Sequence, residues 1–242
     1  VELAKYMLTT LGLDDDISYR FSKWDENNKE KYIGSPQEWE EVQGRMRQIL
    51  DDLNIDYKEA SGEAAFYGPK LDIQIKNVHG KEDTLITIQI DFQLAERFGM
   101  TYVDAEGQTK YPYVIHRTSI GCYERTLALL LEKYAGALPT WLMPEQVRVL
   151  PISDRLIDDA KKVEEQLSRA GIRVSCDTRS EKVGYKIREA QLEKIPYMLV
   201  IGDKEVEEGT VSVRSRKEGD LGSMPVESFL SKILQEIATK AK

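Results

Sequence analysis

The fold class of the first part of the chain is set by two segments, Leu71-Asp72-Ile73-Gln74-Ile75 and, after a turn at His79-Gly80, Ile86-Thr87-Ile88-Gln89-Ile90-Asp91. Apolar and polar residues alternate in both segments, which is the period of a β-strand with one buried face. The two segments and the Gly-containing turn between them predict a β-hairpin. The Thr, Gln and Asp residues of its other face suggest a ligand-facing sheet, although solvent exposure is the simpler interpretation.

Further elements are predicted on both sides of the hairpin. Residues 37–53 place apolar side chains at spacings of three and four, which predicts a helix. Ser35-Pro36 provides a cap and a first-turn proline at its start. Residues 114–116 end another apolar strand, and residues 121–134 form a second predicted helix.

The segment Pro139-Thr140-Trp141-Leu142-Met143-Pro144 interrupts these patterns and is typical of a linker. Beyond it, strands are predicted at 147–152, 172–176, 197–201 and around 211–213, and helices at 154–170, 184–194 and from 226 onward. Strands that alternate with helices predict a parallel or mixed sheet covered by helices. We therefore expect two domains, 1–143 and 144–242.

Composition bounds the class of protein. The chain has 242 residues, of which 31% are charged and 41% hydrophobic, as in ordinary globular proteins. The net charge is −8, and residues 144–242 hold 18 basic and 18 acidic residues, so the excess of acid lies in residues 1–143. An acidic total argues against non-specific coating of DNA, but it allows a local RNA contact.

The sequence shows no segment for membrane insertion or export. No apolar run reaches the roughly 18 residues that a membrane-spanning helix needs, and no signal-peptide pattern opens the chain. We therefore expect a cytoplasmic protein without a membrane partner. The first residue is Val1, so we expect the natural N-terminus to lie upstream. Two cysteines, Cys122 and Cys176, fit a reducing compartment, and neither a CxxC nor an HxxxH spacing supports a self-contained structural zinc site.

Three segments carry candidate functional residues. Tyr67 and Lys70 flank a rigid Gly-Pro turn beside the polar face, where a lysine could meet a phosphate or carboxylate. Arg125 lies in the first turns of a predicted helix, where its charge is unfavourable; it could face a triphosphate or simply pair with Glu124. Solvated charge is the default interpretation of the basic residues of the second domain, which are Arg179, Lys182, Lys186, Arg188, Arg214, Arg216 and Lys217.

Taken together, these strings resemble the threonyl-tRNA synthetases, a class II family. The first part of the resemblance consists of Phe66-Tyr67-Gly68-Pro69-Lys70, Thr87-Ile88-Gln89-Ile90-Asp91-Phe92, Glu96-Arg97-Phe98, His116-Arg117, Gly121-Cys122-Tyr123-Glu124-Arg125 and Pro139-Thr140-Trp141-Leu142. The second part consists of Ala170-Gly171-Ile172-Arg173-Val174, Lys186-Ile187-Arg188-Glu189 and Val200-Ile201-Gly202-Asp203-Lys204-Glu205. The strings occur in order over essentially the whole chain.

The resemblance implies a fold class and a place in a longer enzyme. The implied fold is part of the antiparallel-sheet catalytic domain of a class II synthetase over residues 1–143. A small α/β anticodon-binding domain with a mixed, mainly parallel sheet follows over residues 144–242. The family's first two signature motifs and its editing domain are expected upstream of Val1. The chain is thus expected to be the C-terminal part of the enzyme.

The resemblance also implies roles for individual residues. Arg125 contacts the ATP phosphates and, with Lys70, is a catalytic residue. Tyr67, Lys70, Thr87, Gln89 and Arg125 bind ATP and substrate. His116 is one of three zinc ligands, the other two being expected upstream, while Cys122 stands where a small residue such as Ser or Ala is expected. The anticodon is contacted by Lys182, Arg188, Glu205 and Arg214.

The implied reaction is ATP-dependent charging of threonine tRNA through threonyl-adenylate, with Mg²⁺ and one Zn²⁺ per full-length subunit. A zinc ion that holds both the amino and hydroxyl groups of threonine would reject valine, which an apolar pocket separates poorly. The partners implied are threonine, ATP, threonine tRNA and a second subunit in a homodimer, with no DNA. One histidine cannot hold a catalytic zinc, so this chain alone is expected to be inactive.

Two alternatives stay open. The same fold can serve as a non-catalytic tRNA- or mRNA-binding protein, and zinc-ligand Cys and His residues upstream of Val1 would favour the enzyme. A prolyl- or glycyl-specific relative would share the second domain. The strings Tyr67-Gly68-Pro69-Lys70 and His116-Arg117 argue against it.

Overall fold

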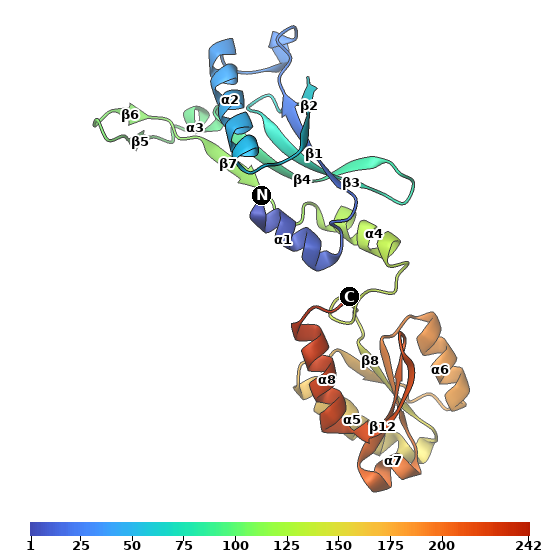
Figure 1. Ribbon diagram of the computed structural model, residues 1–242. Coiled ribbons are helices and arrows are strands. Elements are labelled where there is room, and N and C mark those ends of the chain that lie inside the picture. Colours follow the sequence, from blue (N-terminus) through green and yellow to red (C-terminus); the bar gives the residue numbers. More distant parts are fainter. The chain divides into compact units, whose positions relative to one another are not determined.

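The computed structural model describes residues 1–242, which fold as two compact units, Val1–Glu132 and Lys133–Lys242. Figure 1 traces the chain through both units. The predicted fold class is confirmed, because an antiparallel-sheet unit precedes a small α/β unit. The predicted border between residues 143 and 144 stays a prediction. No helix combines the length and the apolar character that crossing a membrane requires.

The first unit is built on a five-stranded sheet in the order β2-β1-β3-β4-β7. Only β1 and β2 run parallel, while the other neighbours are antiparallel. The elements of this unit are α1 (Glu2–Leu11), β1 (Ile17–Lys23), η1 (Lys29–Lys31), α2 (Pro36–Asp52), β2 (Tyr57–Ser61), β3 (Lys70–Lys76), β4 (Glu82–Asp91), α3 (Leu94–Arg97), β5 (Tyr102–Val103), β6 (Thr109–Lys110), β7 (Val114–Arg117) and α4 (Tyr123–Lys133).

The apolar face of this sheet packs against α2. Leu71 and Ile90 of the predicted hairpin join Phe21 of β1 and the buried face of α2 in one core. Trp39 of α2 is fully buried at its centre and stacks on Trp24 with ring centroids 5.6 Å apart. Side chains of this kind contribute several kcal/mol each to folding, roughly 3–5 kcal/mol for a buried Trp. The opposite, polar face of β3 and β4 is thereby left for the candidate site.

Helix α2 starts where the sequence predicts. The Ser35 hydroxyl accepts a hydrogen bond from the Glu38 N–H at 3.3 Å, and the Glu38 carboxylate accepts one from the Ser35 N–H at 2.7 Å. This reciprocal pair is a capping box, and Pro36 occupies the first turn. The backbone N–H groups of Ser35 and Glu38 therefore both have hydrogen-bond partners.

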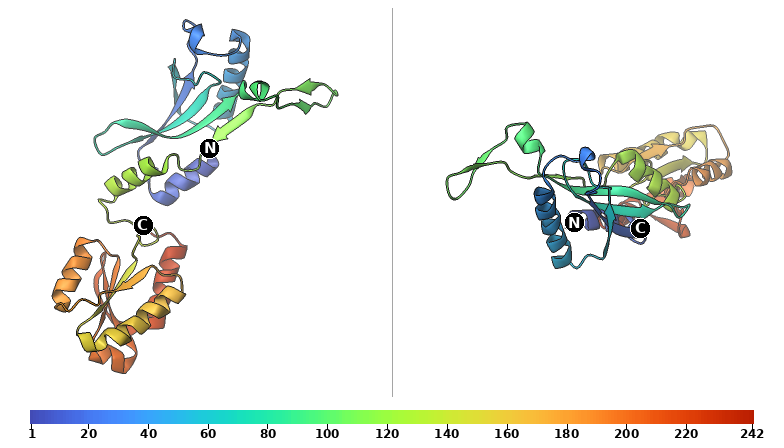
Figure 2. Two further views of the ribbon diagram at one scale, coloured as in Figure 1. Left: turned by 180° about the vertical axis from the view of Figure 1, so that it is seen from behind. Right: turned by 90° about the horizontal axis from the view of Figure 1, so that it is seen from above.

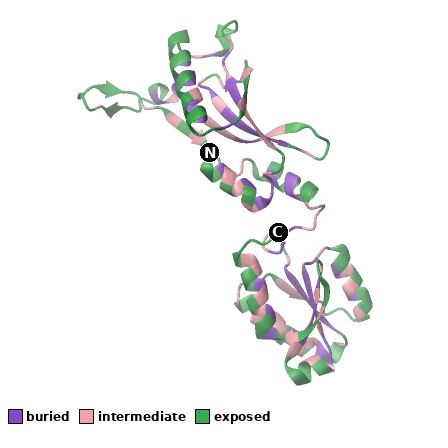
Figure 3. Ribbon diagram, in the orientation of Figure 1, coloured by how far each residue is buried: buried purple, intermediate pink, exposed green.

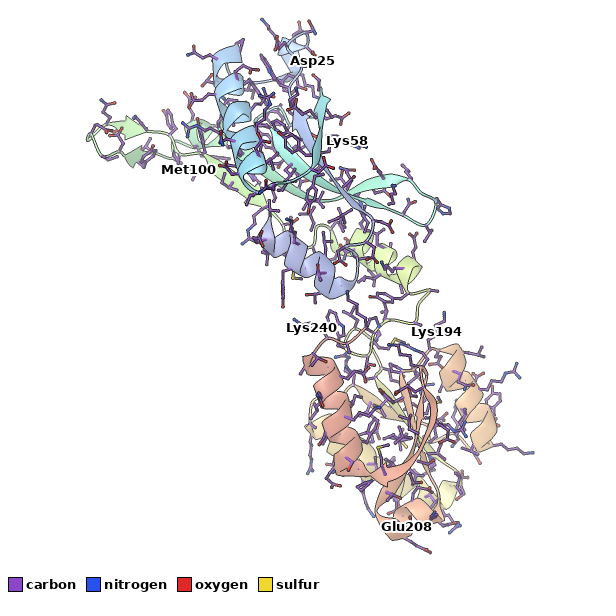
Figure 4. The ribbon with its side chains drawn as sticks, in the orientation of Figure 1. Asp25, Lys58, Met100, Lys194, Glu208 and Lys240 are labelled. Atoms are coloured by element: carbon purple, nitrogen blue, oxygen red, sulfur yellow. The ribbon has the colours of Figure 1, made fainter.

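A β-hairpin arm, β5 and β6, projects from the first unit in the two views of Figure 2. Met100, labelled in Figure 4, lies beside the arm. The arm and its flanks expose large apolar or aromatic side chains, namely Phe98, Met100, Tyr102, Val103, Tyr111, Tyr113 and Ile115. None of these residues belongs to the core that α2 covers.

The second unit has a mixed sheet in the order β12-β11-β10-β8-β9. The neighbours β9, β8 and β10 are parallel, and β11 opposes both β10 and β12, so four strands run one way. The elements are β8 (Val147–Pro151), η2 (Asp154–Leu156), α5 (Ile157–Arg169), β9 (Val174–Cys176), α6 (Val183–Leu192), β10 (Tyr197–Ile201), α7 (Asp203–Glu208), β11 (Thr210–Ser215), β12 (Gly219–Pro225) and α8 (Val226–Ala238).

Helices cover both faces of this sheet. Residues of α5 and α8 share one core with alternate residues of β8, β10 and β11. Ala190 of α6 packs with Leu150 and Met198 on the other face. The buried residues in Figure 3 accordingly run along the central strands. The expected linker segment is tied to this unit, because Arg173 donates to the carbonyls of Trp141 and Met143.

We predict that Ser35→Ala lowers the free energy of unfolding of the first unit by about 1 kcal/mol, since one half of the capping box is lost. Urea unfolding followed by tryptophan fluorescence measures it, because Trp39 lies in the same helix. Ser18→Ala is the control, as its hydroxyl makes one long contact with Glu82 at 3.4 Å. Equal losses in the two variants would contradict the prediction.

Candidate active site

Strand register brings four of the predicted site residues onto one face of the sheet. Lys70 of β3 lies opposite Gln89 of β4, and Gln89 lies opposite His116 of β7. Thr87 precedes Gln89 by two residues and therefore points to the same face. Residues at directly opposed positions on neighbouring strands have side chains within contact distance. The polar row Lys70, Gln89 and His116 thus crosses three strands.

Tyr67 joins this row through the loop that precedes β3. The loop continues the pairing of β4, since the Ile90 N–H donates to the Pro69 carbonyl at 3.1 Å and the Phe92 N–H donates to the Tyr67 carbonyl at 3.3 Å. A Cβ at Gly68 would lie 1.8 Å from the Ile90 carbonyl oxygen, so only glycine fits there. The loop holds the Tyr67 hydroxyl 3.0 Å from Gln89 Oε1, to which it donates. With Oε1 engaged, Gln89 has its Nε2 group to donate.

Lys70 and Thr87 are both bonded to a buried carboxylate, Asp72. The Lys70 Nζ donates to Asp72 Oδ2 at 2.6 Å, and the Thr87 hydroxyl donates to Asp72 Oδ1 at 2.8 Å. Ser22 of β1 is the third donor, at 2.8 Å from Oδ2. The Lys70 ammonium is therefore paired with a carboxylate of the chain itself, and its side chain is only about a fifth exposed (21%).

His116 is oriented by a second buried carboxylate. Its Nε2 lies 2.8 Å from Oδ2 of Asp91, a fully buried residue. The other carboxylate oxygen accepts the N–H groups of Gln93 and Leu94, both at 2.9 Å, at the start of α3. The Tyr67 ring lies 5.6 Å from the imidazole. Asp91 thus fixes which nitrogen of His116 faces the sheet, leaving Nδ1 on the other side of the ring.

The structure also tests whether these residues can hold zinc. A carboxylate–histidine pair such as Asp91–His116 is typical of metal-ligating histidines. The chain nevertheless has no group of three or more His, Cys, Asp or Glu side chains that could hold a metal ion. Because a catalytic zinc takes three protein ligands, the residues of this chain do not fit Zn²⁺ on their own.

Arg125 reaches the sheet from α4. Gly121 before this helix has a φ of +78°, and a Cβ there would lie 1.9 Å from the Leu85 carbonyl oxygen, so the chain passes directly over β4. The Arg125 guanidinium donates to the carbonyl of Thr84, also in β4. Glu124 instead accepts from the Cys122 thiol at 2.8 Å, which holds the pKa of that carboxylate below its usual value. The pairing of Arg125 with Glu124 considered above is thus replaced by this backbone contact.

Comparison with known proteins places the chain in a family. The model "tRNA synthetase class II core domain (G, H, P, S and T)" matches residues 3–134, more than half of the chain. The chain belongs to this class II tRNA synthetase family. The model "Anticodon binding domain" matches residues 146–236 in addition.

Individual relatives point to one branch of this synthetase family. The chain is 65% identical over 240 residues to the threonine–tRNA ligase of Clostridium perfringens and 61% identical over 242 residues to that of Clostridium botulinum. It spans 37% and 38% of the lengths of these relatives. A crystal structure of the RNA-binding domain of threonyl-tRNA synthetase from Cryptosporidium parvum Iowa II matches 97% of this chain and 58% of that one, with a TM-score of 0.88 and 33% identity. The resemblance to threonyl-tRNA synthetases is thereby confirmed.

The four residues predicted to contact the anticodon lie on three elements of the second unit. Lys182 caps α6 and Arg188 lies on its exposed surface. Arg214 of β11 pairs with Asp220 of β12 at 3.2 Å. Glu205 of α7 accepts from the Gly202 N–H at 3.0 Å and from the Ser223 hydroxyl at 3.2 Å. No hydrogen bond or ion pair between members of this set holds them together, so their shared role stays a prediction.

Two of the remaining basic residues predicted to be solvated, Lys186 and Arg216, are instead bonded to backbone carbonyls and largely withdrawn from solvent, so the solvated interpretation is corrected for these two, while Arg179 and Lys217 are exposed. Lys186 is 2% exposed and donates to the carbonyls of Pro151 and Asp177 at 3.2 and 2.9 Å. Arg179 binds both oxygens of Asp177, and this contact holds the pKa of that carboxyl below its usual value. Arg216 donates to the carbonyls of Lys194, Ala137 and Leu138.

Sequence reasoning did not single out the two buried carboxylates, Asp72 and Asp91, or Ser22. In the sequence, each of the two Asp residues is simply one polar residue in an alternating segment of the predicted hairpin. Their position on the ligand-facing side was visible, and a carboxylate on the same face as a Lys or His was a usable signal. Their burial depends on strands that lie far away in sequence, and no local pattern reports it.

We predict that Gly121→Ala lowers the free energy of unfolding by about 1–3 kcal/mol more than Gly80→Ala does. The two glycines have nearly the same φ, +78° and +75°, but a Cβ at Gly80 meets nothing within 4 Å. The difference therefore isolates the collision with the Leu85 carbonyl from the backbone strain that both variants share. Urea unfolding of the two variants measures it, and equal destabilisation would contradict the close approach.

The two cysteines should differ in reactivity. Burial raises the pKa of the Cys176 thiol to about 11, whereas Cys122 is exposed. Because the thiolate is the nucleophile, Cys176 stays protonated and unreactive at pH 8. We predict that iodoacetamide at that pH places one adduct on Cys122, read by peptide mass spectrometry. Labelling of Cys176 is expected only in urea; rapid labelling of it in the folded chain would contradict its burial.

Proposed function

We propose that this chain forms part of an enzyme that charges threonine tRNA with threonine at the expense of ATP. The observation that carries the proposal is the convergence of Tyr67, Lys70, Thr87, Gln89 and His116 on one sheet face. The high identity to threonine–tRNA ligases supports the substrate. Since the chain spans 37% of the length of the first of these relatives, activity and substrates belong to the longer enzyme.

In the proposed reaction the threonine carboxylate attacks the α-phosphate of ATP, pyrophosphate leaves, and the adenylate then passes its threonyl group to the tRNA terminal ribose. Tyr67, Thr87 and Gln89 bind the substrates. Arg125 contacts the ATP phosphates, and Lys70 is the second catalytic residue of the threonine and ATP site. Held side chains of this kind act mainly by positioning and by stabilising developing charge. ATP brings Mg²⁺ with it. We also propose His116 as one ligand of Zn²⁺, which supplies Lewis acidity when bound.

The second unit is proposed as the anticodon reader. Its proposed contacts with the anticodon are Lys182, Arg188, Glu205 and Arg214. Charged side chains can hydrogen-bond to the edges of unstacked bases, and guanidinium planes can stack on their faces. The match of residues 146–236 to an anticodon-binding domain supports this role. A homodimer is proposed as the assembly, and the exposed apolar arm around β5 and β6 is consistent with an interface. The cytoplasm is the proposed location.

A second candidate function is RNA binding without catalysis. The chain supplies no complete metal site of its own, while the anticodon-binding match covers nearly the whole second unit. A chain of this kind could bind tRNA or mRNA without catalysis. The enzyme and the RNA-binding protein differ in whether adenylate is ever formed.

The first experiment measures threonine-dependent ATP–pyrophosphate exchange with zinc supplied. The 242-residue chain alone is expected to give none, because His116 cannot hold zinc by itself. A chimera in which this chain replaces the matching 240 residues of the Clostridium perfringens ligase is expected to exchange. A folded but silent chimera would favour the non-catalytic function, and exchange by the chain alone would contradict the incomplete site.

A second prediction concerns the RNA. We expect Arg214→Ala to weaken binding of threonine tRNA by about 1–3 kcal/mol and to relax the preference for its anticodon. Binding to threonine tRNA and to an anticodon-substituted tRNA, compared by titration, measures both effects. Arg169→Ala is the control, because this arginine is exposed on α5 and pairs only with Glu165 in its own helix. Equal binding by the Arg214 variant and the parent would remove Arg214 from the anticodon contacts.

A further inference from the structure

Asp72 is the least expected member of the polar face. It is 1% exposed, yet it carries a carboxylate rather than an apolar side chain. A buried carboxylate is unfavourable unless donors surround it. Here the three donors are Ser22, Lys70 and Thr87, at 2.8, 2.6 and 2.8 Å. The ammonium group among them indicates that Asp72 is ionised and accepts from all three.

This arrangement fixes the direction of the hydrogen bonds at the surface of the site. A hydroxyl has one proton, and Thr87 gives that proton to Asp72 Oδ1. Thr87 can then meet a ligand only through its lone pairs, so the ligand group that contacts it must be an N–H or O–H donor. Lys70 is affected in a different way, because the same carboxylate balances its positive charge.

We propose that Asp72 is a positioning residue that makes Thr87 an acceptor for an N–H group of the substrate and keeps Lys70 in place as a charge-balanced donor. The inference rests on the proposed function for the identity of the ligand. Two substrate groups have this chemistry, the ammonium of threonine and the amino group of adenine. An asparagine at position 72 would reverse the pattern, since its Nδ2 can donate to Thr87 and it leaves Lys70 without a counter-charge.

The first test is independent of activity and uses the 242-residue chain. The nitrogen-15 NMR signal of the Lys70 ammonium is expected to be visible in the parent, because hydrogen bonding to Asp72 slows its proton exchange. Asp72→Asn is expected to abolish the signal. Asp83→Asn makes the same change in the same hairpin, where the carboxylate meets only Asn77 at 2.9 Å, and the signal should persist. Thr87→Val should keep it too, because Lys70 binds Oδ2 of Asp72 whereas Thr87 binds Oδ1. If Asp72→Asn does not fold, absence of the signal from the folded parent would still overturn the contact.

The second test uses the chimera with the Clostridium perfringens ligase. Asp72→Asn and Thr87→Val are each expected to raise the KM of one substrate about tenfold, with a smaller change in kcat. The losses in the double variant should be less than additive, because Asp72 acts on the substrate partly through Thr87. Any loss beyond that of Thr87→Val alone reports the contact of Asp72 with Lys70. Thr87→Ser keeps a hydroxyl and should restore most of the affinity. Whether the KM of threonine or that of ATP rises identifies the donor group.

The outcomes separate this inference from the proposed function. A Lys70 signal that survives Asp72→Asn, or additive losses in the double variant, would overturn the role of Asp72 even in an active chimera. A parent chimera that folds without activity would count against the proposed function, while the NMR experiment on the chain would still decide whether Asp72 holds Lys70.

Discussion

The pairing register of β4 with its neighbours is the constraint on which the candidate site depends. Lys70, Gln89 and His116 meet only because β3 and β7 both pair with β4 in that register, and a slip of one residue would turn each side chain to the opposite face. Two glycines attach the flanking segments to the same strand. Gly68 lies on the Ile90 carbonyl and Gly121 on the Leu85 carbonyl. Strand β4 therefore fixes both the Tyr67 loop and the start of the Arg125 helix.

Local periodicity was enough to predict part of this fold. The β3–β4 hairpin, the capped helix α2 and the alternating strands and helices of the second unit all follow from neighbouring residues. Strands β1 and β2 were not predicted. Ile17, Tyr19 and Phe21 of β1 do alternate with polar residues, which was a usable signal, whereas β2 (Tyr57–Ser61) has no such alternation. Both strands gain their place in the sheet by pairing with segments that are distant in the sequence. Tyr19, for example, lies between Ile73 and Tyr57 in the sheet. No window of the sequence contains such a pairing.

The residues of the candidate site likewise fall into those that the sequence predicted and those that it missed. Tyr67, Thr87, Gln89, His116 and Arg125 were proposed from strings that resemble a family, and the structure brings the first four onto one face. The carboxylates that orient them were missed, since burial is a property of the assembled sheet. The error at Lys186 has the same cause. Its string is typical of a solvated helix, but the carbonyls of Pro151 and Asp177 capture its ammonium group inside the unit.

The two cationic residues of the candidate site, Lys70 and Arg125, differ in how their charge is balanced. This difference gives them different roles toward an anionic substrate. Lys70 is bound to a carboxylate with 2% side-chain exposure, so most of its attraction for a distant anion is cancelled. Arg125 is held by a backbone carbonyl, which orients the guanidinium without neutralising it, and the residue is exposed. A triphosphate approaching the sheet would therefore meet the undiminished charge of Arg125 first. Lys70 can contribute a placed hydrogen bond, and it can supply charge only if Asp72 releases it.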